Sequence, residues 1–322
     1  MNRFNLRSGF HLDLQTRGRK PSAVQVQHHY FWFIIRRFAR LRATTSPPLD
    51  SNTMQPMLNI AIRAARSAGD HIVRKMNKLP DLKIEQKGQN DYVSEVDRQA
   101  EEKVIETLLS SFPNHGILAE ESGEIEGSDD FRWIIDPLDG TTNYLHSFPH
   151  FSVSIACQHK GRLEHGVIYD PIKQELFSAS RGDGATLNNK RIRVTRIRST
   201  QGALLGTGFP FKHHNQLDEF LNIFSEFFTT ACDIRRAGSA ALDLAYVAAG
   251  RLDGFWESGL NPWDIAAGAL IVREAGGITT DYEGNENFLE LGQVISGNPK
   301  IIGDMLRKIQ SHRLRSGRSA AE

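Results

Sequence analysis

The sequence predicts a layered α/β fold, in which helices pack against sheets. Two segments with a helical period come first in the body of the chain, a run of strand-like segments follows, and helices mixed with short strands return after Pro210. This order of elements is typical of stacked sheet and helix layers and argues against a helical bundle or a β-sandwich. The sequence shows no internal repeat.

Two amphipathic helices are expected at the start of the body. Over Met57–Met76 the apolar residues recur every three or four positions, which places them on one face of a helix that ends before Pro80. A second helix is expected over about Glu95–Ser110, where Ser94 is placed to cap the first turn and Pro113 follows the end. Both helices therefore present an apolar stripe to a core.

Strand-like runs come next, separated by Pro, Gly and Asn turns. Their order along the chain indicates an antiparallel meander. The runs are Arg132–Asp136, Phe151–Gln158, Glu164–Tyr169 and Glu175–Ala179. The turn at Leu187–Lys190 is expected to join two more short strands.

The last part of the body alternates helices and strands. Helices are expected over about 215–228, 239–249 and 263–275, and glycines close the last two. Strands are expected at Leu252–Glu257 and Gly277–Thr280.

Composition and charge divide the chain into three parts. With 39% hydrophobic and 24% charged residues, the sequence is that of an ordinary globular protein. Residues 1–53 carry nine Lys or Arg against two acidic residues and show no regular period, so we expect a disordered leader or a mis-called start, with Met54 and Met57 as alternative initiators. A nucleic-acid arm or an organellar transit peptide would also be basic. Residues 54–310 form the expected globular body, and 311–322 a frayed basic tail.

Nothing in the sequence predicts a membrane protein. The longest apolar run near the start, Phe31–Ile35, is far shorter than the roughly 20 residues that span a bilayer. Cys157 and Cys232 do not make a disulfide framework, and we expect both to be buried small apolar residues. A reducing compartment follows, so we expect a cytoplasmic protein.

A pair of carboxylates marks the most informative stretch. The apolar strand that reaches Asp136 is followed by Pro137, which we expect to stop it, and Gly140 then allows a tight turn into a new helix. Asp136 and Asp139 can converge across this turn, with the carbonyl oxygen of Leu138 between them. Hard oxygen ligands of this kind suit Mg²⁺.

The residues after this pair have a different chemistry. The backbone amides of Gly140, Thr141 and Thr142 lie at the expected helix N-terminus, where unpaired N–H groups favour an anion such as phosphate. A metal site and an anion cradle are therefore expected side by side.

A lone Asp-x-x-Asp is most often a polar turn with a helix cap. Here two more carboxylates stand at element boundaries, since Glu120 ends an apolar segment and Asp264 opens a helix. Clustered acids repel one another and bind protons unless a cation is present. A divalent cation site is therefore the better interpretation.

Three strings resemble, in order, the signatures of the inositol monophosphatase family: AEES, WIIDPLDGTTN and NPWDIAAGALIVREAGG. Three further stretches, MLNIAIRAARSAGDHIV, GTGFPFK and GSAALDLAYVAAGRLDGFWE, are similar to its bacterial branch. The resemblance covers residues 54–310 and implies an α-β-α-β-α layered catalytic domain. It also implies a homodimer and a hydrolysis of inositol monophosphate that depends on Mg²⁺ and is inhibited by lithium.

The resemblance further implies roles for individual residues. Thr141 matches the residue that orients the attacking water, with Asp97 behind it, and Glu120 matches a ligand of the metal that activates this water. The plainer interpretation of Asp97 is charge complementation in the first turn of a helix. Lys87 matches a mobile loop near the metals, or is solvated surface. The implied metal ligands are Glu120, Asp136, the Leu138 carbonyl, Asp139 and Asp264. The implied substrate contacts are Glu257, which accepts a hydrogen bond from a substrate hydroxyl, and the backbone of Gly238, Ser239 and Ala240.

Two other functions stay open. One is a phosphatase for another small ester, such as fructose 1,6-bisphosphate or a 3′-phosphorylated nucleotide, although Glu257 favours a polyol monophosphate. The other follows from the bacterial branch, whose members are also implicated in regulating ribosomal RNA transcription through Nus antitermination factors and RNA polymerase. The body of the chain is net acidic, which argues against tight nonspecific binding to nucleic acid.

Overall fold

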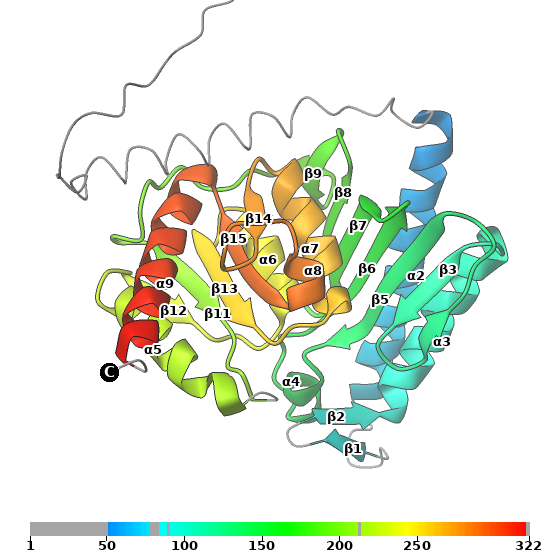
Figure 1. Ribbon diagram of the computed structural model, residues 1–322. Coiled ribbons are helices and arrows are strands. Elements are labelled where there is room, and N and C mark those ends of the chain that lie inside the picture. The colour runs from blue at the N-terminus through cyan, green and yellow to red at the C-terminus, as the bar shows by residue number, and fades with distance from the viewer. Residues whose placement is uncertain (1–50, 77–83, 89–90, 212–213, 320–322) are drawn as a thin grey trace, which may run out of the picture. The chain divides into compact units, whose positions relative to one another are not determined.

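The computed structural model describes residues 51–76, 84–88, 91–211 and 214–319 (Figure 1). The predicted leader lies outside these residues apart from 51–53, which belong to helix α2 (Ser51–Met76). Within the described ranges, no helix combines the length and the apolar character that a membrane span requires.

An eight-stranded sheet forms one β layer. Its strand order is β10-β9-β8-β7-β6-β5-β3-β4, and neighbouring strands are antiparallel except β3 and β5, which run parallel. The predicted meander is confirmed, because β5 to β8 pair in sequence order. The bounds are β3 Gly116–Ala119, β4 Gly123–Ile125, β5 Phe131–Asp139, β6 Ser152–His159, β7 Arg162–Asp170, β8 Glu175–Ser180, β9 Gly184–Leu187 and β10 Lys190–Arg191.

A five-stranded sheet forms the other β layer, with the order β12-β11-β13-β15-β14. Strand β11 runs parallel to β12 and β13, and β15 is antiparallel to β13 and β14. Of these strands, the sequence pattern predicts only β13 and β14. The bounds are β11 Leu204–Thr207, β12 Asp233–Arg235, β13 Gly254–Ser258, β14 Ile278–Thr280 and β15 Gln293–Gly297.

Helices and sheets alternate as the predicted α-β-α-β-α stack (Figure 1). Helix α2 packs with α3 (Glu95–Ser111) on one face of the large sheet. Helices α6 (Ala240–Ala248) and α7 (Pro262–Glu274) lie between the two sheets, and α5 (Leu217–Phe228) and α9 (Pro299–Ser319) cover the outer face of the small sheet. Shorter elements are α4 (Thr141–Leu145), η2 (His214–Gln216) and α8 (Phe288–Leu291).

Strand β5 shows how the sequence produces these layers. Trp133 and Ile135 belong to the core under α2 and α3, whereas Ile134 belongs to the core against α6 and α7. Successive side chains of a strand face opposite sides of the sheet, so a strand covered on both faces is apolar without interruption. Both faces of β5 are therefore fixed by packing, and its end is held in a defined place.

Three features differ from the prediction. Helix α9 continues to Ser319 because Arg and Leu favour a helix and no proline interrupts them, so much of the predicted tail is helical. Cys232 is exposed beside the edge strand β12, whereas Cys157 is buried as expected. Lys87 lies in β1 (Ile84–Gly88), which forms an antiparallel hairpin with β2 (Asp91–Ser94), and not on a loop.

Candidate active site

Three carboxylates meet where strand β5 ends and helix α7 begins. Asp136 and Asp139 come from β5, and Asp264 lies in the first turn of α7. One carboxylate oxygen of each lies within 4.8 Å of those of the other two. The amide of Asn261 donates to Oδ2 of Asp264 (2.7 Å) and fixes its side chain. The fold thus brings together acids that the sequence places far apart.

A β-bulge changes the direction of β5 between the two aspartates. From Asp136 to Asp139, two intervening residues of β5 face a single residue of β6. The strand therefore continues past Pro137, where the sequence pattern predicts it to stop. Proline has no N–H to donate, and a bulge is one of the few places in a sheet that tolerates it. The amide of Leu138 turns inward and donates to Oδ1 of Asp136 (2.9 Å).

Burial and mutual repulsion raise the pKa values of these acids. Burial raises the pKa of Asp136 well above its usual range, and the charges of Glu120, Asp139 and Asp264 raise it further. Burial, followed by the charge of Asp264, raises the pKa of Asp139 to about 7. A cation favours the charged form of a carboxylate and would reverse these shifts. The cluster of carboxylate oxygens therefore fits a hard divalent cation such as Mg²⁺.

Glu120 directly follows strand β3 and interacts electrostatically with this cluster. Its amide donates to a carbonyl oxygen of β5 (3.2 Å), and its charge raises the pKa of Asp136. The next two amides, of Glu121 and Ser122, donate to the two carboxylate oxygens of Glu101 on α3 (2.9 and 2.8 Å). Glu101 is only 3% exposed, so it holds the segment that carries Glu120. Glu101 is not among the residues predicted from the sequence, and an acid on the apolar face of a helix is the signal that could have identified it.

The Thr141 hydroxyl and the Asp97 carboxylate form a pair beside the cluster. The hydroxyl oxygen lies 2.9 Å from Oδ1 of Asp97 and 3.1 Å from the carbonyl oxygen of Leu138. Asp97 also lies in the first turn of α3, so its charge complements that helix as well. The two interpretations of Asp97 are therefore compatible.

Gly140 and Asn143 hold the predicted anion turn against a distant loop. Gly140 has a φ of 100° and precedes the five-residue helix α4. A β-carbon at Gly140 would lie 3.1 Å from the carbonyl oxygen of His150. The Asn143 amide donates to the carbonyl oxygens of His150 (2.8 Å) and Ala237 (2.9 Å). Residues 140–142 therefore lie close to the loop that leads into helix α6.

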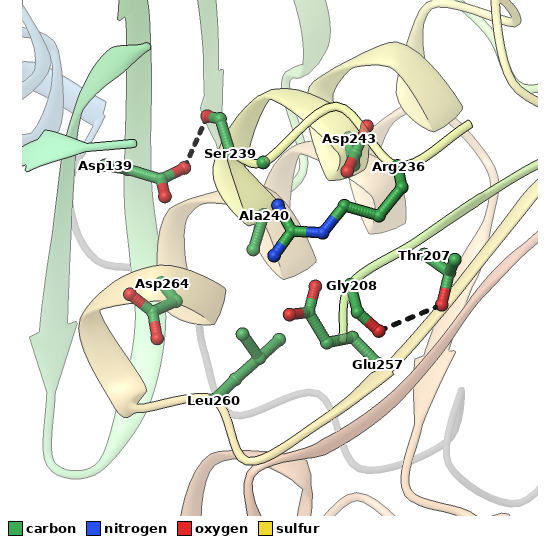
Figure 2. A pocket seen from close by; sticks show the side chains of 11 residues that line it. Asp139, Thr207, Gly208, Arg236, Ser239, Ala240, Asp243, Glu257, Leu260 and Asp264 are labelled. Atoms are coloured by element: carbon green, nitrogen blue, oxygen red, sulfur yellow. Dashed lines mark hydrogen bonds between the residues drawn. The ribbon is translucent and has the colours of Figure 1, made fainter. Parts of the chain in front are cut away.

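A cavity of about 120 Å³ adjoins the carboxylates (Figure 2). Ser239 Oγ and the amide of Ala241 donate to Oδ2 of Asp139 (2.5 and 2.8 Å), which joins the carboxylate cluster to the cavity wall. Several predicted site residues line the cavity: Asp139, Gly238, Ser239, Ala240, Glu257 and Asp264. The other residues that line it are not predicted from the sequence: Thr207, Gly208, Arg236, Asp243 and Leu260.

Glu257 lies across the cavity from Asp139 (Figure 2). Burial raises the pKa of its carboxyl to about 8, although the positive charge of Arg236 opposes the shift. The carboxylate packs on the backbone of Gly208, where a β-carbon would lie 1.8 Å from Oε1. Asp243, which is 2% exposed, faces Arg236 and Glu257 from helix α6. A single acid within the apolar run of α6 is the signal that could have identified Asp243.

Comparison with known proteins identifies one protein family and several similar sequences. A profile described as the inositol monophosphatase family matches residues 53–314. The protein named Nus factor SuhB of Pseudomonas aeruginosa is 55% identical over 264 residues, which cover 80% of this chain and 97% of that protein. The protein of the same name in Escherichia coli K12 is 52% identical over 258 residues, with the same shares covered.

The similar solved structures include suhB proteins and inositol monophosphatases. The extragenic suppressor protein suhB of Bartonella henselae matches with a TM-score of 0.76 and 46% identity, covering 78% of this chain and 97% of that one. The inositol monophosphatase of Anabaena matches with a TM-score of 0.72 and 38% identity, covering 80% and 97%. These relatives confirm the family that the sequence motifs and the layered fold indicate.

Proposed function

This chain belongs to the inositol monophosphatase family, and we propose that it hydrolyses inositol monophosphate to inositol and phosphate with the help of Mg²⁺. The observation that carries the proposal is the meeting of Asp136, Asp139 and Asp264 beside a cavity that Glu257 also lines. The acids offer a site for the cation, and the cavity offers a site for the alcohol part of the ester.

The acid cluster has the chemistry of a magnesium site. Its oxygens are the hard donors that Mg²⁺ prefers, and raised pKa values are what clustered carboxylates show without a counter-ion. Bound there, Mg²⁺ would supply an acidified water and stabilise the departing ester oxygen. Asp136 interacts electrostatically with the other three acids, so its loss should be the most severe. The proposed ligands are Glu120, Asp136, the Leu138 carbonyl, Asp139 and Asp264.

Thr141 and Asp97 are proposed to position the attacking water. A hydroxyl has one hydrogen and two lone pairs. When Thr141 donates its hydrogen to Asp97, its lone pairs are left to accept a hydrogen bond from the water. No covalent intermediate is expected, because the nucleophile is water.

The two ends of the substrate are proposed to bind on opposite sides of Asp139. The phosphate would lie against the backbone amides of residues 140–142. The alcohol would enter the cavity. There Glu257 would accept a hydrogen bond from one of its hydroxyls, and the backbone of 238–240 would contact the ring.

Phosphate release from inositol 1-phosphate tests the proposal. We expect turnover with Mg²⁺, little without it, and inhibition by added lithium. A panel that includes fructose 1,6-bisphosphate and a 3′-phosphorylated nucleotide ranks the substrate against the alternative small esters. Absence of Mg²⁺-dependent release from every ester of the panel would refute a phosphatase function.

A second candidate function is the regulation of ribosomal RNA transcription through Nus factors and RNA polymerase. It is favoured by relatives that are 55% and 52% identical and are named Nus factor SuhB. Asp136 is 2% exposed, so Asp136→Asn leaves the protein surface unchanged. We expect this variant to complement a transcription phenotype as well as the unchanged chain does. Failure to complement, with the fold intact, would tie the regulatory role to the metal site.

We further propose, from the same family resemblance, that residues 54–310 form the catalytic domain and that the protein is a cytoplasmic homodimer. Sedimentation of the purified protein measures the oligomeric state. A sedimentation coefficient of a monomer at micromolar concentration would contradict the dimer.

A further inference from the structure

We propose that Arg236 is a specificity-determining residue that donates hydrogen bonds to a hydroxyl oxygen of the substrate alcohol. Arg236 and Glu257 would together select phosphate esters whose leaving group carries a hydroxyl. The inference rests on the proposed function and deepens it, because neither the motifs nor the family resemblance assigns Arg236 to the site.

Aromatic rings and one glycine hold the guanidinium of Arg236 in place. Its central carbon lies 5.2 Å from the ring centre of Phe209 and 5.4 Å from that of Phe211. The two rings pack edge to face, with their centres 5.5 Å apart. One terminal nitrogen packs on Gly238, where a β-carbon would lie 2.7 Å from it. Ring contacts of this kind position a guanidinium without consuming its N–H donors.

The donors of this guanidinium are available to a ligand. Across the ranges 51–76, 84–88, 91–211 and 214–319, no residue makes a hydrogen bond or an ion pair with Arg236. Glu257 and Asp243 interact with it through charge alone. Arg236 is an exposed residue that lines the cavity, and Figure 2 shows its guanidinium between Ala240 and Glu257. Arginine carries five N–H donors, so this side of the cavity is suited to an oxygen acceptor.

The neighbouring carboxyl groups decide which kind of oxygen fits. A hydroxyl can accept from Arg236 and donate to an ionised Glu257, and it can also accept from a protonated Glu257. A hydroxyl therefore satisfies both side chains in either protonation state. A second phosphate could accept from Arg236, but wherever Glu257 or Asp243 is ionised it would face that negative charge across the cavity. The structure therefore favours a neutral polyol over an alcohol that carries a second anion.

The test compares two esters in Arg236→Met. Inositol 1-phosphate has hydroxyls on its leaving group, and 4-nitrophenyl phosphate has none. Because hydrogen bonds from a charged donor are lost, kcat/KM for inositol 1-phosphate should fall about 10- to 100-fold, mainly through KM. The value for 4-nitrophenyl phosphate should stay within about twofold, because its leaving group has no hydroxyl and its nitro oxygens are only weak acceptors. Arg236→Lys keeps the charge without the planar fork and should recover only part of the loss.

Arg235→Met is the matched control. Arg235 is the preceding residue, it pairs with Asp233 (2.5 Å), and it does not line the cavity. Both esters should react in this variant as they do in the wild type. Thermal unfolding of all three variants separates a local effect from a loss of fold.

The outcomes distinguish this inference from the proposed function. An equal loss on both esters, or no loss on inositol 1-phosphate, overturns the role of Arg236. A larger loss on an inositol bisphosphate than on the monophosphate also overturns it, because Arg236 would then recognise a second anion. A wild-type protein that releases phosphate from neither ester with Mg²⁺ refutes the proposed function itself, and this inference falls with it.

Discussion

The Thr141 hydroxyl lies 2.9 Å from Oδ1 of Asp97, although 44 residues separate the two in sequence. The contact joins the first residue of α4 to the first turn of α3. Asp97 is 1% exposed, so water does not compete for this bond. The bond fixes the direction of the remaining lone pairs on Thr141, which is what the positioning of a water molecule requires.

Replacing Thr141 by valine tests this role. Valine keeps the shape and removes the hydroxyl, so kcat for inositol 1-phosphate should fall by about 10²-fold, as expected for a misplaced reactant, while KM changes little. Thr141→Ser keeps the hydroxyl and should retain most of the turnover. Steady-state kinetics at saturating Mg²⁺ measure both. A valine variant with the turnover of the serine variant would contradict the positioning role.

Asp136→Asn should abolish Mg²⁺-dependent phosphate release and leave the fold intact. The buried carboxylate is the acid on which three neighbouring charges act, so its removal weakens cation binding more than any other single change. Calorimetric titration with Mg²⁺ and phosphate release measure the effect. Asp130→Asn is the control, because Asp130 pairs with Lys160 on the surface. An Asp136→Asn variant with wild-type turnover would overturn the ligand assignment.

The part of the site that one short segment supplies, Asp136 to Asp139, is predictable from the sequence. Asp136, Leu138 and Asp139 lie within four residues, and the neighbouring proline and glycine restrict the backbone enough to predict that the carboxylates converge. The bulge is not predictable, because it depends on how β5 pairs with β6. Tertiary pairing, not the local preference of Pro137, decides where the strand ends.

The cavity half of the site is not predictable from local pattern. Arg236 follows another arginine and resembles solvated surface, yet Phe209 and Phe211 hold it over the cavity. Gly208 resembles an ordinary loop glycine until Glu257 packs on it. These relationships join the segment after β11, the residue that follows β12, and β13, and no spacing along the chain records them.

The metal-free protein should lose stability as the pH rises. The pKa of Asp139 is raised to about 7, above its value in the unfolded chain, so the folded state binds this proton more tightly. The resulting stabilisation is fully present below about pH 4 and is lost as the pH rises through about 7. The Tm in EDTA should therefore fall relative to that of Asp139→Asn over this range, and Mg²⁺ should restore it at the upper end. A Tm difference between the two proteins that does not change with pH would contradict this mechanism.

Glu101→Gln should weaken Mg²⁺ binding without touching a proposed ligand. Each carboxylate oxygen of Glu101 accepts one amide, from Glu121 and Ser122, and a glutamine would present an N–H₂ group to one of these donors. Loss of such outer support typically costs about 10- to 100-fold in metal affinity. The Mg²⁺ dependence of turnover measures it. Glu102→Gln is the exposed neighbouring control, and equal Mg²⁺ dependence in the two variants would rule out the supporting role.

Gly208→Ala should displace Glu257 and leave the rest of the protein unchanged. A β-carbon at this position would lie 1.8 Å from Oε1 of Glu257 and 2.0 Å from its carboxyl carbon, and the atoms nearest to it all belong to this one side chain. A side-chain end can move, so we expect a loss of substrate contact and not a loss of fold. KM for inositol 1-phosphate should rise about 10-fold, as expected for one lost hydrogen bond, while Tm stays close to that of the wild type.

The same clash predicts strong coupling between Gly208 and Glu257. In a Glu257→Ala background the obstacle is gone, so adding Gly208→Ala should change kcat/KM little, and the double-mutant cycle should give a coupling of about 1 kcal/mol or more. Gly303→Ala in helix α9 is the control, because among the described residues no atom beyond its chain neighbours and its own helix backbone lies within 4 Å of the added carbon. Additive effects of the two substitutions would mean that Gly208 acts through the backbone. In that case the packing of the carboxylate on glycine would not be what positions Glu257 in the cavity.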